Sequence, residues 1–359
     1  MNVMLLINSF NLGGAEKLAY DLAKEFVNAG ICVYLTSMGS IKTPLEHRLE
    51  KEMRQAGVHT LSLDKPAGRK RLQVIWDIRT LLLKHKIDIL HTNGQSPDFF
   101  GRLACAFCPG CKAVVTIHST AGYSKKNERR LSGLTAAYTA VADQTAQYMH
   151  EHLAVTKPIY VIQNGIDPDR YAADRRIRGN AIQILTVARV MKQKCFLEAA
   201  GGMRDYLTAH PQAKWVIVGD TTQDTAYYQA VVQALADVAG QVVFLGAVEH
   251  PEAYYQTADC FFLPSAYEGF GIVFVEAMMA QLPVVCNRVG VIPEILSLGG
   301  AVSLLEGTSI AQAIDNALQL SSETLLKNSS IVREHYSIRA SARQYVNLYE
   351  DLCRKARRS

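Results

Sequence analysis

Residues 265–285 read SAYEGFGIVFVEAMMAQLPVV. The apolar run that leads into them, within DCFFLPS (259–265), predicts a buried strand, and IVFVEAMMA (272–280) predicts a helix. Gly269 and Gly271 lie in the turn between the two, where glycine lets backbone N–H groups come close to a ligand. The N-terminus of the following helix favours an anion at the same place. This stretch therefore predicts a strand–turn–helix unit that binds a ligand at its turn.

Two acids belong to this unit. Glu268 lies in the turn and Glu276 in the helix, eight positions further on. An ionised carboxylate only accepts hydrogen bonds, and vicinal hydroxyls are matching donors. Two carboxylates repel a phosphate, so we expect them to hold the hydroxyls that flank a phosphate, on a sugar and on a ribose.

The alternation of strand and helix extends along the whole chain and is typical of parallel sheets in an α/β fold. The helix after the first strand has an apolar stripe, Leu18, Leu22 and Phe26, at four-residue spacing. The expected strands are Val3–Ile7, Ile31–Thr36, Ile87–His91, Ala113–Ile117, Ile159–Ile162, Ile182–Val187, Trp215–Val218, Val242–Phe244, Cys260–Leu263 and Val284–Cys286.

The chain of 359 residues exceeds the usual size of a single core. Residues 163–180, QNGIDPDRYAADRRIRGN, are polar and rich in turn residues, and we expect them to connect two domains. The predicted domains are residues 1–165 and 166–339, each Rossmann-like. A last amphipathic helix, within 340–359, is expected to pack back on the first domain. Open α/β sheets bind ligands at the carboxyl ends of their strands, so the motifs at those ends are the candidate site.

The composition indicates an ordinary globular protein, since 49% of the residues are hydrophobic and 20% are charged. The first residues, MNVMLLINSF, resemble a strand more than a signal peptide because they lack a basic region and a cleavage site. No apolar stretch reaches the roughly 18 residues that a membrane-spanning helix needs. We therefore expect a cytoplasmic protein whose eight cysteines are reduced.

Charge is distributed unevenly along the chain. Residues 1–165 contain 20 Lys and Arg against 13 Asp and Glu, a balance of +7, whereas residues 166–359 contain 18 against 20, a balance of −2. Two basic clusters, KPAGRKR (65–71) and KKNERR (125–130), lie in the first half. Such clusters attract anionic lipid surfaces or phosphorylated ligands, and they also occur in solvated loops. No basic motif interleaved with aromatic residues accompanies them, which argues against nucleic acid.

Basic and glycine residues follow other expected strands. Gly13 and Gly14 precede the first helix, where backbone N–H groups can hold a phosphate, although such a pair also serves tight loops. Arg189 and Lys194 follow one strand of the second half and can either clamp a diphosphate or remain exposed loop residues. His118 ends a strand of the first half, as a hydrogen-bonding residue or as part of the site. No G-x-G-x-x-G or Walker motif occurs, which disfavours a dehydrogenase or a P-loop kinase.

In these motifs the chain resembles the family 4 retaining glycosyltransferases of the GT-B fold. The E-x7-E segment that begins at Glu268 is the most specific of them, and the resemblance covers nearly the whole chain. It implies two Rossmann-like domains that face each other across a central cleft. The residues that carry it are Gly13-Gly14-Ala15-Glu16, His118, Asn164-Gly165-Ile166-Asp167, Arg189, Lys194, Glu268 to Glu276, AMMAQLPVV (277–285) and PEIL (293–296).

The resemblance implies a role for each site residue. Glu268 would contact the transferred sugar, and Glu276 would hold the ribose of the nucleotide. Arg189 and Lys194 would bind the diphosphate, and His118 would lie near the donor sugar. The expected donor-binding residues are Gly13, Gly14, Arg189, Lys194, Glu268, Gly269, Phe270, Gly271, Ile272 and Glu276, and the expected catalytic residues are His118, Arg189, Lys194 and Glu268.

Enzymes of this family work without a bound metal, so cationic side chains and helix dipoles stabilise the leaving diphosphate. We accordingly expect no cofactor and no metal. Asp167 and Asp169 form a D-x-D, the metal signature of another glycosyltransferase fold, but they lie in a turn-rich connection. The C-x-x-C-x-x-C array at residues 105–111 matches metal-site spacing, yet it lacks a nearby fourth ligand and is interpreted as small buried side chains.

Two residues depart from the family pattern. Cys195 stands where the family commonly has glycine directly after the lysine, which can alter that turn. Gln281 replaces another frequent glycine at the end of a helix. Neither position belongs to the charged residues of the site.

The sequence therefore predicts a retaining glycosyltransferase that moves a sugar from a nucleoside diphosphate sugar, expected to be a UDP-sugar, to a saccharide or lipid-linked acceptor. We expect a place in bacterial surface polysaccharide or lipopolysaccharide biosynthesis. The basic first half suggests a phosphorylated lipid-linked acceptor and peripheral contact with the anionic inner face of the membrane. Two alternatives stay open, a sugar-nucleotide epimerase of the same architecture and a non-catalytic nucleotide-sugar binder.

Overall fold

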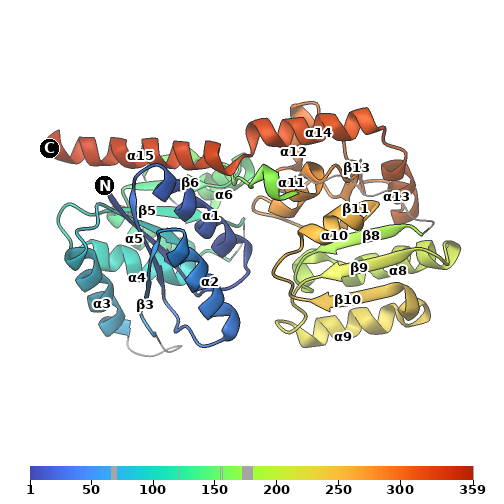
Figure 1. The fold of residues 1–359 in the computed structure, drawn as a ribbon, viewed down its shortest axis with the longest axis horizontal. Coiled ribbons are helices and arrows are strands. Elements are labelled where there is room, and N and C mark those ends of the chain that lie inside the picture. Colours follow the sequence, from blue (N-terminus) through green and yellow to red (C-terminus); the bar gives the residue numbers. More distant parts are fainter. Residues whose placement is uncertain (66–70, 121, 154, 156, 172–180, 359) are drawn as a thin grey trace. The chain divides into compact units, whose positions relative to one another are not determined.

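The computed structural model describes residues 1–65, 71–120, 122–153, 155, 157–171 and 181–358. The chain forms two compact units. Unit 1 comprises Met1–Gly165 and Ile338–Ser359, and unit 2 comprises Ile166–Ser337. Each unit is an α/β domain built on a parallel sheet, as the sequence predicts (Figure 1).

The sheet of unit 1 contains seven parallel strands in the order β3-β2-β1-β4-β5-β6-β7. The sequence pattern predicts five of them and misses β3 and β6, whose sequences, HTLS and AYTA, lack the run of Val, Ile and Leu that marks the others. The strands are β1 (Asn2–Ile7), β2 (Cys32–Ser37), β3 (His59–Ser62), β4 (Ile89–Asn93), β5 (Lys112–Ile117), β6 (Ala137–Ala140) and β7 (Ile159–Val161).

Helices cover both faces of this sheet (Figure 1). The central strand β1 sends Val3, Leu5 and Ile7 to one face and Met4 and Leu6 to the other, because successive strand residues point in opposite directions. The first face packs against α1 (Gly14–Asn28), α2 (Pro44–Gln55) and α15 (Ile338–Arg358), and the second against α3 (Arg71–Lys84) and α4 (Gln95–Cys105). The remaining helices are α5 (Lys125–Leu131), η1 (Ser132–Leu134) and α6 (Asp143–His152).

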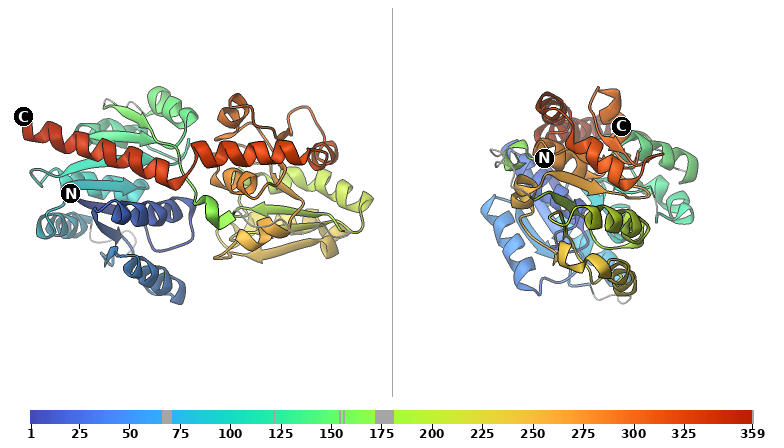
Figure 2. Two further views of the ribbon diagram at one scale, coloured as in Figure 1. Left: turned by 45° about the horizontal axis from the view of Figure 1, so that its top comes forward. Right: turned by 90° about the vertical axis from the view of Figure 1, so that its right-hand side faces the viewer.

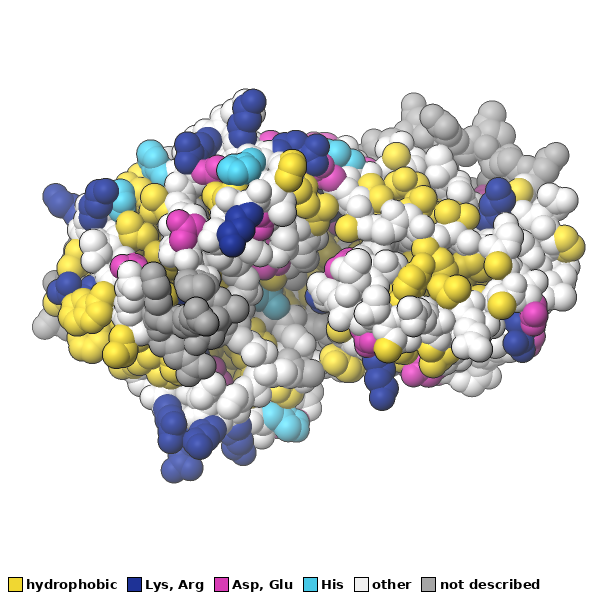
Figure 3. All heavy atoms as spheres, turned by 90° about the horizontal axis from the view of Figure 1, so that it is seen from below, with side chains coloured by type: hydrophobic (Ala, Val, Ile, Leu, Met, Phe, Trp, Pro, Cys, Tyr) yellow, Lys and Arg dark blue, Asp and Glu magenta, His cyan; other side chains and the backbone are white. Residues whose placement is uncertain are grey.

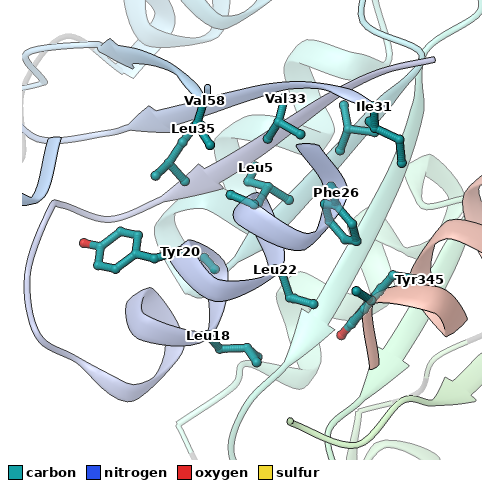
Figure 4. Close-up of a cluster of buried hydrophobic side chains, with 14 of the residues drawn as sticks. Leu5, Leu18, Tyr20, Leu22, Phe26, Ile31, Val33, Leu35, Val58 and Tyr345 are labelled. Carbon is teal, nitrogen blue, oxygen red and sulfur yellow. The ribbon is translucent and has the colours of Figure 1, made fainter. Parts of the chain in front are cut away.

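The predicted apolar stripe of α1 lies at the centre of the first face. Leu18, Leu22 and Phe26 are at most 2% exposed and pack on Leu5 and Leu35 (Figure 4). Burial of such side chains contributes roughly 1.5–3 kcal/mol each. This cluster fixes α1, and with it the loop that carries Gly13 and Gly14.

The long C-terminal helix α15 belongs to the same core. Figures 1 and 2 show it in red beside α1, and the rings of Tyr345 and Tyr349 lie 6.4 and 5.6 Å from the ring of Phe26. The Tyr349 hydroxyl lies 2.6 Å from Nδ1 of the buried His91, whose Nε2 lies 2.5 Å from the hydroxyl of Thr116. Apolar packing and a buried polar network therefore both hold α15 on the sheet.

The sheet of unit 2 contains six parallel strands in the order β10-β9-β8-β11-β12-β13. The sequence pattern predicts all of them except β13, which has two residues. The strands are β8 (Gln183–Val187), β9 (Lys214–Val218), β10 (Val242–Gly246), β11 (Cys260–Leu263), β12 (Val284–Cys286) and β13 (Ser303–Leu304).

One core of unit 2 forms around Trp215, whose ring stacks on Phe196 at 5.9 Å and meets the edge of Phe262 at 5.8 Å. The Trp215 indole N–H donates to the Thr186 hydroxyl at 2.9 Å, so its polar atom is satisfied inside the core. The helices are α7 (Pro168–Tyr171), η2 (Lys192–Lys194), α8 (Phe196–Ala209), α9 (Thr225–Ala234), η3 (Ala236–Gln241), α10 (Glu252–Thr257), α11 (Ile272–Met279), α12 (Ile292–Ser297), α13 (Ile310–Leu318) and α14 (Ser322–His335).

The polar connection between the units begins as a turn. The backbone N–H of Asp169 donates to Oδ1 of Asp167 at 3.1 Å, and α7 begins at Pro168. The D-x-D therefore forms the start of a short helix, as its turn residues suggest. Residues 172–180 of the predicted connection lie outside the described residues. No helix in the described part of the chain is long and apolar enough to cross a membrane.

Candidate active site

Strand order in unit 2 reverses between two neighbouring strands, β8 and β11. Open α/β sheets bind ligands at such a switch point, outside the carboxyl ends of the strands. Lys194 follows β8 and Glu268 follows β11, and the Lys194 Nζ lies 2.6 Å from Oε1 of Glu268. Their side chains are only 13% and 8% exposed. The fold thus forms a largely buried ion pair at the predicted ligand edge from residues 74 positions apart.

The two loops that carry this pair are joined directly. The backbone N–H of Ala266 donates to the Gln193 carbonyl at 3.0 Å, and the Gln193 side chain donates to the Tyr267 carbonyl at 2.8 Å. These bonds set the loop after β8 beside the loop after β11. The two loops are therefore fixed side by side, which brings the Lys194 ammonium to the Glu268 carboxylate.

The turn after Glu268 depends on two glycines with positive φ. Gly271 caps α11 with φ +80°, and a Cβ there would meet the Phe274 ring at 2.6 Å. Gly290 has φ +58°, and a Cβ there would lie 2.2 Å from the Phe270 carbonyl oxygen and 3.0 Å from Cβ of Glu268. Gly290 is a residue that the sequence analysis missed, because the segment it packs against lies about 20 positions away in the chain.

The other turn residues have distinct surroundings. Phe270 is 3% exposed, and its ring meets the edge of the Tyr336 ring at 5.8 Å. Gly269 is buried, and Ile272 is half-buried and begins α11. The backbone at this turn therefore stands at a helix N-terminus, as the sequence predicts, while the Phe270 side chain belongs to the core.

Glu276 has different partners from Glu268. Its Oε1 accepts a hydrogen bond from the Tyr171 hydroxyl at 2.5 Å, and its Oε2 accepts one from the Tyr255 hydroxyl at 2.8 Å. Burial, followed by the charge of Glu276, raises the pKa of both tyrosines far above the usual range, so both remain donors. Glu276 is 2% exposed. The sequence analysis missed both tyrosines, since nothing in their local pattern points to this carboxylate.

Arg189 lies apart from that ion pair and is exposed. Its Nη1 donates to Oε1 of Gln223 at 2.9 Å. Hydrogen bonds from Thr222 and the positive charge of Arg189 lower the pKa of Asp220 at the end of β9. The Arg189 guanidinium thus remains open to solvent on the same edge of the sheet.

Both departures from the family pattern fall on left-handed residues. Cys195 has φ +55° between η2 and α8, and Gln281 has φ +57° after α11. A side chain in that region costs roughly 1–2 kcal/mol, which is why glycine is the usual occupant. Cys195 thus adopts a conformation that glycine takes more readily.

In unit 1, the two glycines before α1 differ. Gly13 is the N-cap, its N–H donates to Oδ1 of Asn11 at 2.7 Å, and a Cβ there would meet the Glu16 carboxylate at 2.3 Å. Gly14 begins α1, and a Cβ there would have nothing within 4 Å. Because Gly13 has φ −64° and the close atoms are the ends of flexible side chains, neither position strictly requires glycine.

His118 directly follows β5 and is half-buried. Its Nε2 lies 3.0 Å from Oδ1 of Asn93, the last residue of β4. Burial lowers the pKa of His118 to about 4, so the imidazole is neutral at physiological pH. With Nε2–H donating to Asn93, Nδ1 is an acceptor.

The cysteine array of α4 is part of the packing. Cys105, Cys108 and Cys111 lie in one cluster with the helix α3, and the Cys105 thiol donates to the Cys111 carbonyl at 3.5 Å. Across the residues that the structure describes, no group of three or more His, Cys, Asp or Glu is arranged to hold a metal ion.

The predicted site residues therefore divide between the units. Unit 1 carries Gly13, Gly14 and His118, and unit 2 carries the rest. Within unit 2 the fold joins Lys194 to Glu268, while Glu276 has a separate tyrosine environment.

Two family profiles match this chain. The profile of Glycosyltransferase Family 4 matches residues 12–170, and that of Glycosyl transferases group 1 matches residues 181–322. Together they span most of both units.

Individual proteins match over the full length. The chain is 23% identical over 375 residues to N-acetyl-alpha-D-glucosaminyl L-malate synthase of Bacillus anthracis, covering 96% of this chain and 95% of the relative. A glycosyltransferase structure from Rickettsia africae superposes with a TM-score of 0.83 at 17% identity, covering 98% of each chain. Anabaena HepE, solved in complex with UDP-glucose, superposes with a TM-score of 0.78 at 18% identity, covering 98% of this chain and 100% of that one.

Proposed function

Because the chain belongs to glycosyltransferase family 4 and has the GT-B fold, we propose that it is a retaining glycosyltransferase that uses a UDP-sugar donor. That it is a glycosyltransferase follows from the family. The choice of UDP is supported by HepE, which was solved with UDP-glucose. The acceptor in this proposal is a saccharide or a lipid-linked saccharide of bacterial surface polysaccharide or lipopolysaccharide biosynthesis.

The observation that carries the proposal is the Lys194–Glu268 pair at the switch point of unit 2. A diphosphate at this strand edge would take hydrogen bonds from Lys194 and from the exposed Arg189, and both charges would stabilise it as it leaves. The N-terminus of α11 would add N–H groups. For Gly13 and Gly14 we keep the donor-binding role that the family resemblance implies. No metal is invoked in this scheme.

The two glutamates receive separate tasks. Glu268 sits beside Lys194 and would accept hydrogen bonds from hydroxyls of the transferred sugar. Glu276 would hold the ribose, as its family position suggests. Both of its oxygens accept a tyrosine hydrogen bond and Glu276 is 2% exposed, so a ribose hydroxyl would share the carboxylate with Tyr171 and Tyr255 or displace one of them.

Retention of configuration fits a same-face attack without a protein nucleophile. The acceptor oxygen would form its bond to the anomeric carbon while the bond from that carbon to the phosphate oxygen breaks. The acceptor proton would pass to the departing phosphate, and UDP would leave. His118, neutral above about pH 4, would position the donor sugar through a hydrogen bond and not through charge.

Membrane contact is proposed for unit 1. Most of the Lys65–Arg71 cluster lies outside the described residues, but four basic residues of α5 are exposed, namely Lys125, Lys126, Arg129 and Arg130. Helix α3 also exposes large apolar side chains, with Leu72 76% and Trp76 56% exposed, and the Trp76 ring stacks on the 57% exposed Phe107 at 6.3 Å. Hydrophobic and basic side chains lie near one another at the left of Figure 3. Aromatic and basic side chains together suit an anionic lipid surface.

The donor proposal is tested with purified protein and a panel of UDP-, GDP- and ADP-sugars. We expect one UDP-sugar to raise the melting temperature most, because a ligand of the folded state stabilises by mass action. Lys194→Met should weaken UDP binding by about tenfold or more, whereas Lys192→Met, an exposed lysine of the same short helix, should not. Equal effects of the two substitutions would contradict the assigned role of Lys194.

Stereochemistry and membrane binding are tested separately. NMR of the glycoside product should show the anomeric configuration of the donor, and the inverted configuration would reject the same-face mechanism. Neutral residues in place of Lys125, Lys126, Arg129 and Arg130 should weaken binding to vesicles of anionic phospholipid at low salt. Binding that is unchanged in this variant would exclude α5 as a membrane contact.

A further inference from the structure

A small pocket lies in unit 1, at the N-terminal end of α4. Its volume of about 30 Å³ is large enough to admit a water-sized group, so a hydroxyl group can enter it. Asp98 and Arg102, each 1% exposed, and the buried Glu128 form its inner wall. The exposed Gln95 and Ser124 also line it and give it a mouth at the surface.

The Asp98 carboxylate has the unusual chemistry in this pocket. Among the residues that the structure describes, neither of its two oxygens has a partner with hydrogen-bond geometry, although the side chain is buried. The nearby Thr92 hydroxyl opposes the rise in the Asp98 pKa through a weak interaction, and its own hydrogen bond, at 3.4 Å, goes to the Val114 carbonyl. A buried carboxylate without partners costs free energy, and such a group in a native protein calls for a ligand or water that satisfies it.

The Arg102 guanidinium does not donate to the Asp98 carboxylate, because its N–H groups bind other acceptors. Its Nη1 and Nη2 donate to the two oxygens of Glu128 at 2.7 and 2.8 Å, and its Nε donates to the backbone carbonyl of Asp98 at 2.9 Å. The positive charge of Arg102 is therefore balanced by the negative charge of Glu128. When it is ionised, Asp98 gives the pocket a surplus negative charge, which repels anions and favours hydrogen-bond donors.

The pocket lies at the same strand edge as His118. Asp98 is in the first turns of α4, which directly follows β4, and the last residue of β4 is the Asn93 that contacts His118. The Tyr123 ring lines the pocket, and its hydroxyl is hydrogen-bonded to the backbone of His118. On the other side of the pocket, Nε2 of Gln95 donates to the Gly122 carbonyl at 2.7 Å. The pocket and the histidine are therefore parts of one surface of unit 1.

We propose that this pocket is an acceptor subsite in which the Asp98 carboxylate accepts a hydrogen bond from a hydroxyl of an uncharged saccharide. The inference rests on the proposed glycosyltransferase function and adds what the acceptor must offer, a neutral donor group of hydroxymethyl size at this point. A phosphate on the acceptor would have to lie elsewhere. Burial raises the pKa of Asp98 to about 7, so acceptor binding should strengthen as pH rises through 7, while Tyr123 stays protonated and Arg102 and Glu128 remain paired.

The test compares Asp98→Asn, Asp98→Glu and the control Asp351→Asn, an exposed residue of α15 in the same unit. Asn removes the charge at constant shape, and Glu keeps the charge but fills the small pocket. The probes are methyl glycosides of glucose, galactose, mannose and N-acetylglucosamine, with glucose 6-phosphate as the anionic comparison. UDP affinity is measured by calorimetry, and transfer is measured by product formation from the donor selected in the nucleotide-sugar screen.

We expect the KM for the best methyl glycoside to rise about tenfold or more in both Asp98 variants, with UDP affinity within about twofold of the unchanged protein. The Asp351 variant should behave as the unchanged protein. An acceptor KM that stays constant in the Asp98 variants, or a preference for glucose 6-phosphate that Asp98→Asn abolishes, would overturn the proposal. A parallel loss of UDP affinity and transfer would also overturn it, since Asp98 would then serve the fold or the donor.

Failure of the proposed function is distinguishable from failure of this subsite. If no donor supports transfer to any glycoside, the glycosyltransferase proposal fails and saturation-transfer NMR with the same methyl glycosides decides on the pocket. A signal that Asp98→Asn removes supports the subsite. No signal in the unchanged protein, or an equal signal in the variant, means that the pocket holds only an ordered water.

Discussion

Lys194 and Glu268 form an ion pair with a separation of 2.6 Å between Nζ and Oε1, at the adjacent ends of β8 and β11. Two hydrogen bonds join the loops that carry these groups. One links the backbones of Ala266 and Gln193, and the other runs from the Gln193 side chain to the Tyr267 carbonyl. In the proposed function, a diphosphate that binds here would compete with Glu268 for the Lys194 ammonium.

Glu268→Gln is expected to separate binding from turnover. Removing the carboxylate frees the Lys194 ammonium, so UDP should bind as tightly as before or more tightly. Transfer should fall by roughly 10² or more if Glu268 contacts the sugar in the transition state. Calorimetry with UDP and product formation measure the two effects, with Glu323→Gln on the exposed start of α14 as the control. A variant with near-normal turnover would remove Glu268 from the site.

Tyr171→Phe and Tyr255→Phe should each destabilise unit 2. Either change leaves one oxygen of the buried Glu276 without its hydroxyl partner, which costs roughly 1–3 kcal/mol of unfolding free energy. Urea unfolding measures the loss, and Tyr254→Phe, a half-buried neighbour on α10, provides the matched control. If the donor KM rises as well, the tyrosines also position Glu276 for the nucleotide. Unchanged stability in both variants would mean that the carboxylate finds other partners.

The rate contribution of His118 should not depend on pH near neutrality. Its pKa of about 4 keeps the imidazole neutral from pH 6 to pH 8, so His118→Asn should lower transfer by a constant factor across that range. The measurement is the ratio of the two transfer rates at pH 6, 7 and 8. A ratio that changes about tenfold would show that His118 titrates in the working range and acts through its charge.

Asp98→Asn should stabilise the protein in a pH-dependent way. The pKa of Asp98 rises from 3.8 to about 7 on folding, because burial disfavours the charged form. The stability linked to protonated Asp98 is therefore fully present below about pH 3.8. It is lost as pH rises through 7, where the buried carboxyl must ionise. At pH 8 the variant should gain up to about 4 kcal/mol, and the gain should shrink toward pH 4. Urea unfolding at pH 5 and pH 8 checks this, and a gain that is equal at both values would contradict it.

Cys195→Gly is expected to stabilise unit 2 by roughly 0.5–1 kcal/mol. The cysteine has φ +55°, where glycine avoids the steric cost of a side chain but loses more chain entropy on folding. Cys195→Ser keeps a side chain in the same conformation and should leave the unfolding midpoint nearly unchanged. A glycine variant that is less stable than the serine variant would show that the thiol's own contacts outweigh the strain.

Local patterns in the sequence determine much of this molecule. The apolar runs that form β1, β8 and β11 and the stripe of α1 give the α/β class, because a buried strand and an amphipathic helix are recognisable within a few residues. The E-x7-E segment and its glycines place a turn and a helix N-terminus where the structure has them. The strands β3, β6 and β13 were not predicted because their sequences, HTLS, AYTA and SL, contain no run of apolar residues.

Contacts between distant segments were decided only by the tertiary structure. Strand order brings Lys194 to Glu268, places Tyr171 and Tyr255 around Glu276, and gives the buried Asp98 carboxylate no partner with hydrogen-bond geometry within the described part of the chain. These relations depend on which strands become neighbours and on which side chains satisfy one another after packing. Periodicity along the chain is a local property, so it specifies neither the neighbours of a strand nor the partners of a buried side chain.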